Sequence, residues 1–103
     1  MSKEDLVNVW RSARIADEKL IEAFLKVPRE SFVPEELKEE AYMDTPLPIP
    51  YGKTISQPTT IIIMTTALDV RNGQKILEIG TGSGYQAAIL ARIMAMFSSV
   101  KQA

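Results

Sequence analysis

The chain has 103 residues, of which 46% are hydrophobic and 24% are charged, a balance typical of one soluble globular domain. Its 12 Lys and Arg and 13 Asp and Glu give a formal net charge of −1, so the basic excess typical of nucleic-acid binders is absent. Without Cys or His, the sequence excludes disulfides, Cys or His metal sites and a histidine base. We therefore expect no metal site, and any chemistry must use hydroxyls, carboxylates, Lys, Arg or a bound cofactor.

The N-terminal sequence MSKEDLVNVW is charged and amphipathic, whereas a signal peptide has an apolar run after a basic start. No stretch approaches the ~20 apolar residues of a membrane helix. We therefore expect a cytoplasmic protein that binds neither membranes nor nucleic acid.

Two amphipathic helices are predicted near the N-terminus. The first begins at the candidate N-cap Ser2, where Asp5 completes a capping box. The second begins at the candidate N-cap Asp17 and ends before Pro28. Their apolar faces consist of Leu6, Val9, Trp10 and Ala13 in the first helix and Leu20, Ile21, Phe24 and Leu25 in the second. We expect Trp10, Phe24 and Leu25 to pack in the core rather than contact a cofactor.

The next segment predicts a short helix and then a long connection. Pro34 suits the first turn of a helix over residues 35–42, whose acidic run Glu35 to Glu40 we interpret as a solvated face rather than a metal site. Residues 44–58 contain four prolines and a glycine, so we expect no regular element there. We expect this loop to be ordered and to pack on the rest of the domain through its apolar side chains, which are Leu47, Ile49, Tyr51 and Ile55. Ser56 and Pro58 then favour a helix start, although TTIIIMTT has strand propensity.

The second half contains a strand, a glycine loop and a helix, in that order. KILEI is a short apolar strand candidate, GTGSG follows it, and residues 85–97 have good helix propensity. Glycines between a buried strand and a helix N-terminus let the backbone approach a ligand. This pattern predicts a nucleotide-like cofactor on a Rossmann-type sheet, and the alternative is a glycine-rich surface loop in an unrelated α/β domain.

The glycine spacing bears on which cofactor binds. The dinucleotide fingerprint is GxGxxG, whereas Gly80, Gly82 and Gly84 are spaced GxGxG. That spacing, with Glu78 before it, resembles motif I of class I methyltransferases that use S-adenosylmethionine. A dinucleotide oxidoreductase stays open as a third interpretation.

Three segments together resemble the protein-L-isoaspartate O-methyltransferase family: VPRESFVP, EEAYMDTPLPIPYGKTISQP and ILEIGTGSGYQAAILARI. The resemblance covers residues 1–93 and implies that Ser56 is the active-site serine. It also implies that Thr54, Ile55 and Gln57 line the cofactor and substrate cleft. The cofactor-binding residues would be Glu78, Gly80, Thr81, Gly82, Ser83, Gly84 and Tyr85. Without the resemblance, a helix N-cap would be the simpler interpretation of Ser56.

The implied reaction transfers a methyl group from S-adenosylmethionine to the α-carboxylate of an L-isoaspartyl residue in a damaged protein. The methyl ester then cyclises to a succinimide. A carboxylate is already ionised at neutral pH, so the transfer needs no strong general base, which fits a chain without histidine. Ser56 would hold the substrate carboxylate by a hydrogen bond.

The resemblance implies a longer protein than this chain. The family is roughly twice as long, and its acidic ribose ligand would fall at residues 98–101, where the chain has none. We therefore expect an incomplete α/β Rossmann-like fold: helical residues 1–45, an active-site loop at 46–57 and a truncated cofactor domain at 58–103. The alternative is a mostly helical, self-associating fragment that is a non-catalytic interaction module. For a truncated methyltransferase we expect the tail after residue 93 to be foreign, the chain to self-associate and its activity to be impaired, whereas a natural interaction module would need a tail that evolved with it.

Overall fold

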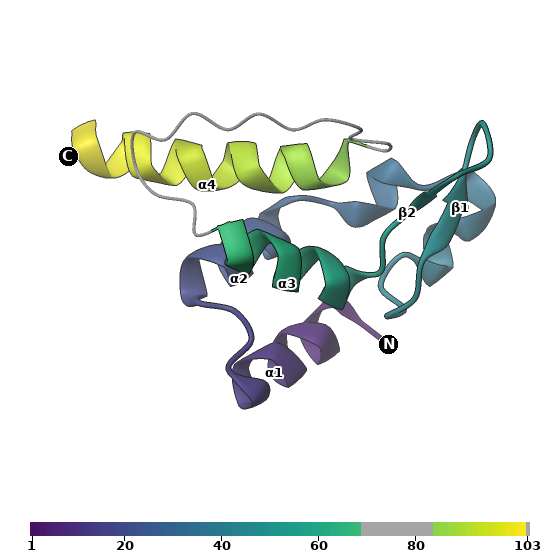
Figure 1. Cartoon of the computed structure of the whole chain (residues 1–103), viewed down its shortest axis with the longest axis horizontal. Helices are drawn as coiled ribbons and strands as arrows, with labels where there is room; N and C mark the ends of the chain where they lie inside the picture. The colour runs from purple at the N-terminus through teal and green to yellow at the C-terminus, as the bar shows by residue number, and fades with distance from the viewer. Residues whose placement is uncertain (69–83, 103) are drawn as a thin grey trace.

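The computed structural model describes residues 1–68 and 84–102 (Figure 1). Its order of elements is α1 (Lys3–Ala13), α2 (Glu18–Lys26), the 3₁₀ helices η1 (Arg29–Phe32) and η2 (Glu35–Glu40), β1 (Leu47–Ile49), β2 (Lys53–Ile55), α3 (Pro58–Leu68) and α4 (Tyr85–Gln102). The two strands form a small hairpin at one end of a helical body, and α4 lies along one side (Figure 1). The predicted strand at residues 76–79 lies outside the described residues.

The N-terminal caps of α1 and α2 are as predicted. The Asp5 amide donates to the Ser2 hydroxyl at 3.1 Å, and the Ser2 amide donates to Asp5 Oδ2 at 2.8 Å. The bond from the Ser2 amide lowers the pKa of Asp5 from its ordinary value. At the second helix, the Leu20 amide donates to Asp17 Oδ1 at 2.9 Å. Each cap satisfies an amide that has no partner within its helix.

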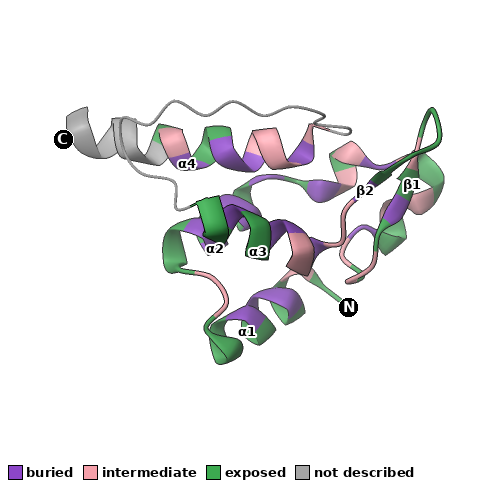
Figure 2. Cartoon of the chain, in the orientation of Figure 1, coloured by how far each residue is buried: buried purple, intermediate pink, exposed green. Residues whose placement is uncertain are grey.

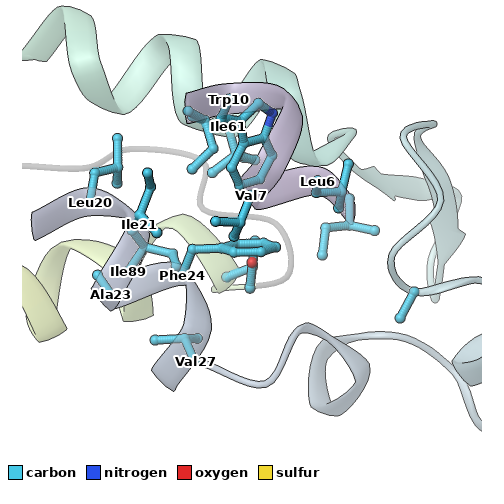
Figure 3. Close-up of a cluster of buried hydrophobic side chains, with 14 of the residues drawn as sticks. Leu6, Val7, Trp10, Leu20, Ile21, Ala23, Phe24, Val27, Ile61 and Ile89 are labelled. Atoms are coloured by element: carbon cyan, nitrogen blue, oxygen red, sulfur yellow. The ribbon is translucent and has the colours of Figure 1, made fainter. Parts of the chain in front are cut away.

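The hydrophobic core gathers side chains from α1, α2, α3 and α4 (Figure 3). Trp10 is 0% exposed and meets Phe24 edge to face, with ring centroids 4.7 Å apart. Ile61 of α3 and Ile89 of α4 close the cluster from two sides (Figure 3). The prediction that Trp10 and Phe24 belong to the core is therefore confirmed.

The buried faces of α1 and α2 are rotated from the predicted ones. Val9 is 52% exposed and Leu25 is 37% exposed, so placing them on the core faces was wrong. Val7 and Ala23 are buried instead, and each of the two helices has a buried and an exposed face (Figure 2). Ala13 is also exposed, at the last residue of α1. Sequence spacing allowed several helix faces, and only the packing of the two helices selects one.

The short helix predicted over residues 35–42 is present as the 3₁₀ helix η2, which ends at Glu40, and its four glutamates are exposed as predicted. The prediction of no regular element in residues 44–58 was wrong, because this connection contains the hairpin of β1 and β2, in which Leu47 pairs with Ile55 and Pro48 with Thr54. In a two-stranded hairpin both strands are edge strands. Proline is tolerated there because its missing N–H can lie on the side of the strand that pairs with no neighbour.

Tyr51 lies at the tip of this hairpin and is 97% exposed, so the prediction that it packs down was wrong. Tyr51 and Gly52 have φ values of 67° and 72°, the left-handed region that tight turns use. By contrast, Leu47 and Ile55 are buried and Ile49 is partly buried. The hairpin therefore packs through one face and extends its turn into solvent.

Helices α3 and α4 confirm two further predictions. Pro58–Leu68 is helical despite its β-branched residues, because the interior contacts of Ile61 and Ile62 outweigh local propensity. Helix α4 begins at Tyr85 as predicted and continues to Gln102. In the described ranges, 1–68 and 84–102, the structure contains no helix with the length and apolar character to span a membrane.

Candidate functional site

The start of α3 is held by a hydrogen-bond network that joins three segments. The Thr59 amide donates to Asp44 Oδ1 at 2.9 Å, and the Thr59 hydroxyl donates to Asp44 Oδ2 at 2.6 Å. The Trp10 indole N–H donates to the same hydroxyl at 3.0 Å. Asp44 therefore supplies the N-terminal cap of α3, so the alternative in which Ser56 is the N-cap was wrong.

We expect Thr59→Val to lower the free energy of unfolding by about 1–3 kcal/mol, because it removes two partly buried hydrogen bonds while keeping the side-chain shape. Urea unfolding followed by circular dichroism measures the change as a shift of the midpoint at constant slope. Thr60→Val is the matched control, since Thr60 is the next residue and is also half-buried. Equal midpoints for the two variants would contradict the network.

The segment predicted to form the active site runs from the end of β2 to the start of α3. Thr54 is exposed, Ile55 is buried in the core, and Ser56 and Gln57 are half-buried. The Gln57 carbonyl accepts the Ile61 amide at 3.1 Å. Ser56 thus lies at a junction fixed by the hairpin on one side and by a capped helix on the other.

Arg29 connects this junction to two other parts of the molecule. Its side chain is 0% exposed, with Nε donating to the Ala41 carbonyl at 2.6 Å and Nη2 donating to the Ser56 carbonyl at 2.9 Å. The guanidinium carbon lies 5.2 Å from the centroid of the Tyr85 ring. Burial lowers the pKa of Arg29 from its ordinary value. One buried cation therefore holds the backbone of Ser56 against the first residue of α4.

The backbone of Arg29 belongs to a second network. Its amide donates to the Tyr42 hydroxyl at 3.0 Å, and that hydroxyl donates to Glu30 Oε2. Burial raises the pKa of Tyr42, and the acceptor Glu30 raises it further. Lys3 lies 5.1 Å from the Tyr42 ring centroid and Lys38 donates to the Glu30 carbonyl at 2.9 Å. These contacts fix η1 and η2 around Arg29.

The start of α4 is the described part of the predicted cofactor site. Gly84 has a φ of 80°, a conformation that favours glycine, and its carbonyl accepts the Ala88 amide at 3.0 Å. Tyr85 is 1% exposed and packs edge to face on Phe32 at 5.4 Å. Burial raises the pKa of Tyr85. An 18-residue helix begins here, and the positive end of its dipole suits a polar or anionic ligand group.

Five of the predicted cofactor-binding residues lie outside the described residues: Glu78, Gly80, Thr81, Gly82 and Ser83. Residues 98–101, where the resemblance would place the acidic ribose ligand, lie within α4 and contain no carboxylate. In the ranges that the structure covers, no cluster of three potential acidic metal ligands occurs.

Sequence reasoning missed Arg29, Asp44 and Thr59. A single arginine beside Glu30 has the pattern of a solvated surface pair, and no periodicity indicates that it is buried. Asp44 caps a helix that begins 15 positions later in the chain. The sequence does not indicate that these two segments lie side by side, so Asp44 could not be recognised as a cap.

Comparison with known proteins identifies the fold and the family. The sequence model of the protein-L-isoaspartate(D-aspartate) O-methyltransferase family matches residues 1–101. The chain is 48% identical over 101 residues to the protein-L-isoaspartate O-methyltransferase of Methanoculleus marisnigri, covering 97% of this chain and 46% of that protein. It is 52% identical over 92 residues to protein-L-isoaspartate O-methyltransferase 2 of Archaeoglobus fulgidus, covering 89% and 42%.

A solved structure gives the same result. The chain matches a crystal structure assigned to a protein-L-isoaspartate O-methyltransferase of Plasmodium falciparum in complex with S-adenosyl-L-homocysteine, with a TM-score of 0.76 and 30% identity, covering 93% of this chain and 43% of that one. The fold of this chain is therefore similar to part of the fold of a methyltransferase. The chain belongs to the protein-L-isoaspartate O-methyltransferase family.

The comparisons also correct one expectation. The resemblance was expected to end at residue 93, but the family match extends to residue 101 and so includes most of the segment interpreted as foreign. The chain spans about half the length of the curated relatives that it matches. Family membership also makes the dinucleotide oxidoreductase interpretation wrong.

Proposed function

We propose that this chain supplies the N-terminal part of a methyltransferase that transfers a methyl group from S-adenosylmethionine to the α-carboxylate of L-isoaspartyl residues in damaged proteins. The observation that supports it most is the family match over residues 1–101. The S-adenosyl-L-homocysteine bound to the Plasmodium falciparum structure supports the cofactor. The division into segments 1–45, 46–57 and 58–103, and a cytoplasmic location, stay predictions.

The proposed roles follow the order of the chain. Ser56 holds the substrate carboxylate by a hydrogen bond, and Thr54, Ile55 and Gln57 line the cofactor and substrate cleft. The cofactor is held by Glu78, the backbone of residues 80–84 and Tyr85. The Gly84 conformation and the positive end of the α4 dipole fit the polar groups of S-adenosylmethionine, which supplies the electrophilic methyl group when bound. The protein then aligns the reacting atoms and excludes water.

The alternative proposal is a non-catalytic fragment on the same scaffold that self-associates. It is supported by the exposed apolar side chains of α3, namely Ile63, Met64 and Leu68, because a helix that is apolar on all sides is normally buried. In this proposal the chain acts as an interaction module, and its methyltransferase activity is impaired or absent.

Calorimetric titration with S-adenosylhomocysteine distinguishes the two proposals. For the methyltransferase we expect a micromolar dissociation constant that increases at least tenfold in Gly82→Val, because a branched side chain prevents close approach of the loop backbone. Gly52→Val is the matched control: it strains a backbone with a φ of 72° at the hairpin tip, where an added Cβ meets no atom within 4 Å, and so reports the effect of local strain away from the cofactor loop. No heat up to millimolar ligand would favour the non-catalytic fragment.

A further inference from the structure

Arg29 is a buried charge that the proposed reaction does not yet use. In the described part of the chain it forms no ion pair with a carboxylate, and its Nη1 has no hydrogen-bond partner. Burying a cation without an opposite charge costs free energy, and arginine keeps its charge at neutral pH. Core packing alone would be served as well by an apolar side chain of similar volume, so the cation calls for a specific explanation.

The contacts of Arg29 supply that explanation. Its two carbonyl partners, Ala41 and Ser56, are 12 and 27 positions away in the sequence, and Tyr85, whose ring lies beside the guanidinium, begins α4. The carbonyl that accepts from Arg29 Nη2 is that of Ser56, the residue proposed to hold the substrate. The planar guanidinium fixes both carbonyl directions at once, which a lysine ammonium cannot do.

We infer that Arg29 is a positioning residue, which sets the distance and orientation of Ser56 relative to the start of α4 and so couples the substrate site to the cofactor site. We call Arg29 with its contacts to Ser56 and Tyr85 the clamp. The inference rests on the proposed function, since the coupling matters only if Ser56 binds the substrate and Tyr85 lies at the cofactor site. When a mutation far from the reacting atoms moves them by about 1 Å, the rate can fall by about 100-fold. We therefore expect loss of the Arg29 contacts to disturb the alignment of the reactants more than the affinity for the cofactor.

The test compares Arg29→Lys with Tyr42→Phe by nuclear magnetic resonance of the full chain. Tyr42→Phe removes the hydroxyl that accepts the Arg29 amide and donates to Glu30, but leaves the guanidinium contacts of Arg29 intact. In the unmutated chain we expect S-adenosylhomocysteine to shift the amide signals of both Tyr85 and Ser56. In Arg29→Lys we expect the Tyr85 shift to persist and the Ser56 shift to fall at least threefold, whereas Tyr42→Phe retains both.

Equal Ser56 shifts in Arg29→Lys and the unmutated chain would overturn the inference, and so would equal losses in the two variants, because these would reflect destabilisation alone. If Arg29→Lys does not fold, the Arg29 Nε–H signal of the unmutated chain provides the test. It must shift on ligand addition together with Tyr85, and a fixed signal refutes the coupling.

A ligand-free measurement separates this inference from the proposed function. Amide hydrogen exchange at residues 55–57 and at Tyr85 should accelerate at least tenfold in Arg29→Lys and much less in Tyr42→Phe. No acceleration overturns the clamp whether or not the chain binds the cofactor. Absence of any ligand shift in the unmutated chain, with exchange accelerated as expected, overturns the proposed function and with it the coupling, and leaves Arg29 only a structural clamp.

Discussion

Replacing Trp10 with alanine is expected to destabilise the chain more than any other single core substitution. Trp10 is the largest completely buried side chain, and it packs on Phe24 and donates to Thr59. Truncation of a buried Trp to Ala costs about 3–5 kcal/mol, against a total stability of about 5–15 kcal/mol for a typical domain. Trp10→Ala should therefore be largely unfolded in mild urea.

Two controls separate the sources of this effect. Trp10→Phe keeps an aromatic ring but loses the indole N–H, so we expect an intermediate loss of stability. Val9→Ala truncates the neighbouring exposed residue and should change the free energy of unfolding by less than about 0.5 kcal/mol. Far-UV circular dichroism in urea measures all three without relying on tryptophan emission. A Trp10→Ala midpoint equal to that of Val9→Ala would contradict the observed core.

The elements that sequence reasoning predicted best are those with local causes. The caps at Ser2 and Asp17 involve residues only three positions apart, so their geometry is readable from the chain itself. The start of α4 is similarly local, because Gly84 ends the glycine loop and a run of helix formers follows it. Such features depend on few contacts with distant residues, and the structure confirms them.

The failures all depend on tertiary packing. Residues 47–55 form a hairpin because Leu47 and Ile55 pack into the core, which compensates for prolines that disfavour a strand interior. The face of α1 is chosen by its neighbours, so Val7 is buried in place of Val9. Each of these outcomes requires knowing what lies opposite the segment, and one sequence does not contain that information.

The candidate site divides in the same way. Ser56 was predicted from a resemblance, but its immediate surroundings depend on Arg29, which belongs to the VPRESFVP segment of that resemblance and carries no sequence signal of its burial. The hydrogen bond from Arg29 to the Ser56 carbonyl spans 27 positions. The structure thus adds to the motif a buried charge that fixes the backbone of the predicted serine.

Substitution of Ser56 by alanine is expected to lower methyl transfer to an isoaspartyl peptide by about 10- to 100-fold. A hydrogen bond to a charged group contributes about 1.5–3 kcal/mol, and each 1.4 kcal/mol corresponds to a tenfold change. The affinity for S-adenosylhomocysteine should stay within about twofold of the unmutated chain, because the cofactor-binding residues are separate. A radiolabelled methyl-transfer assay and calorimetry give the two quantities.

Ser31→Ala is the matched control, since Ser31 is an exposed serine of η1 and its loss should leave both quantities unchanged. The backbone of Ser56 carries the Arg29 contact, so Ser56→Ala keeps the clamp and removes only the hydroxyl. A parallel fall in cofactor affinity would mean that the serine supports the cofactor site instead of the substrate. An unchanged rate would show that the carboxylate is held by other groups, and the role proposed for Ser56 would then be wrong.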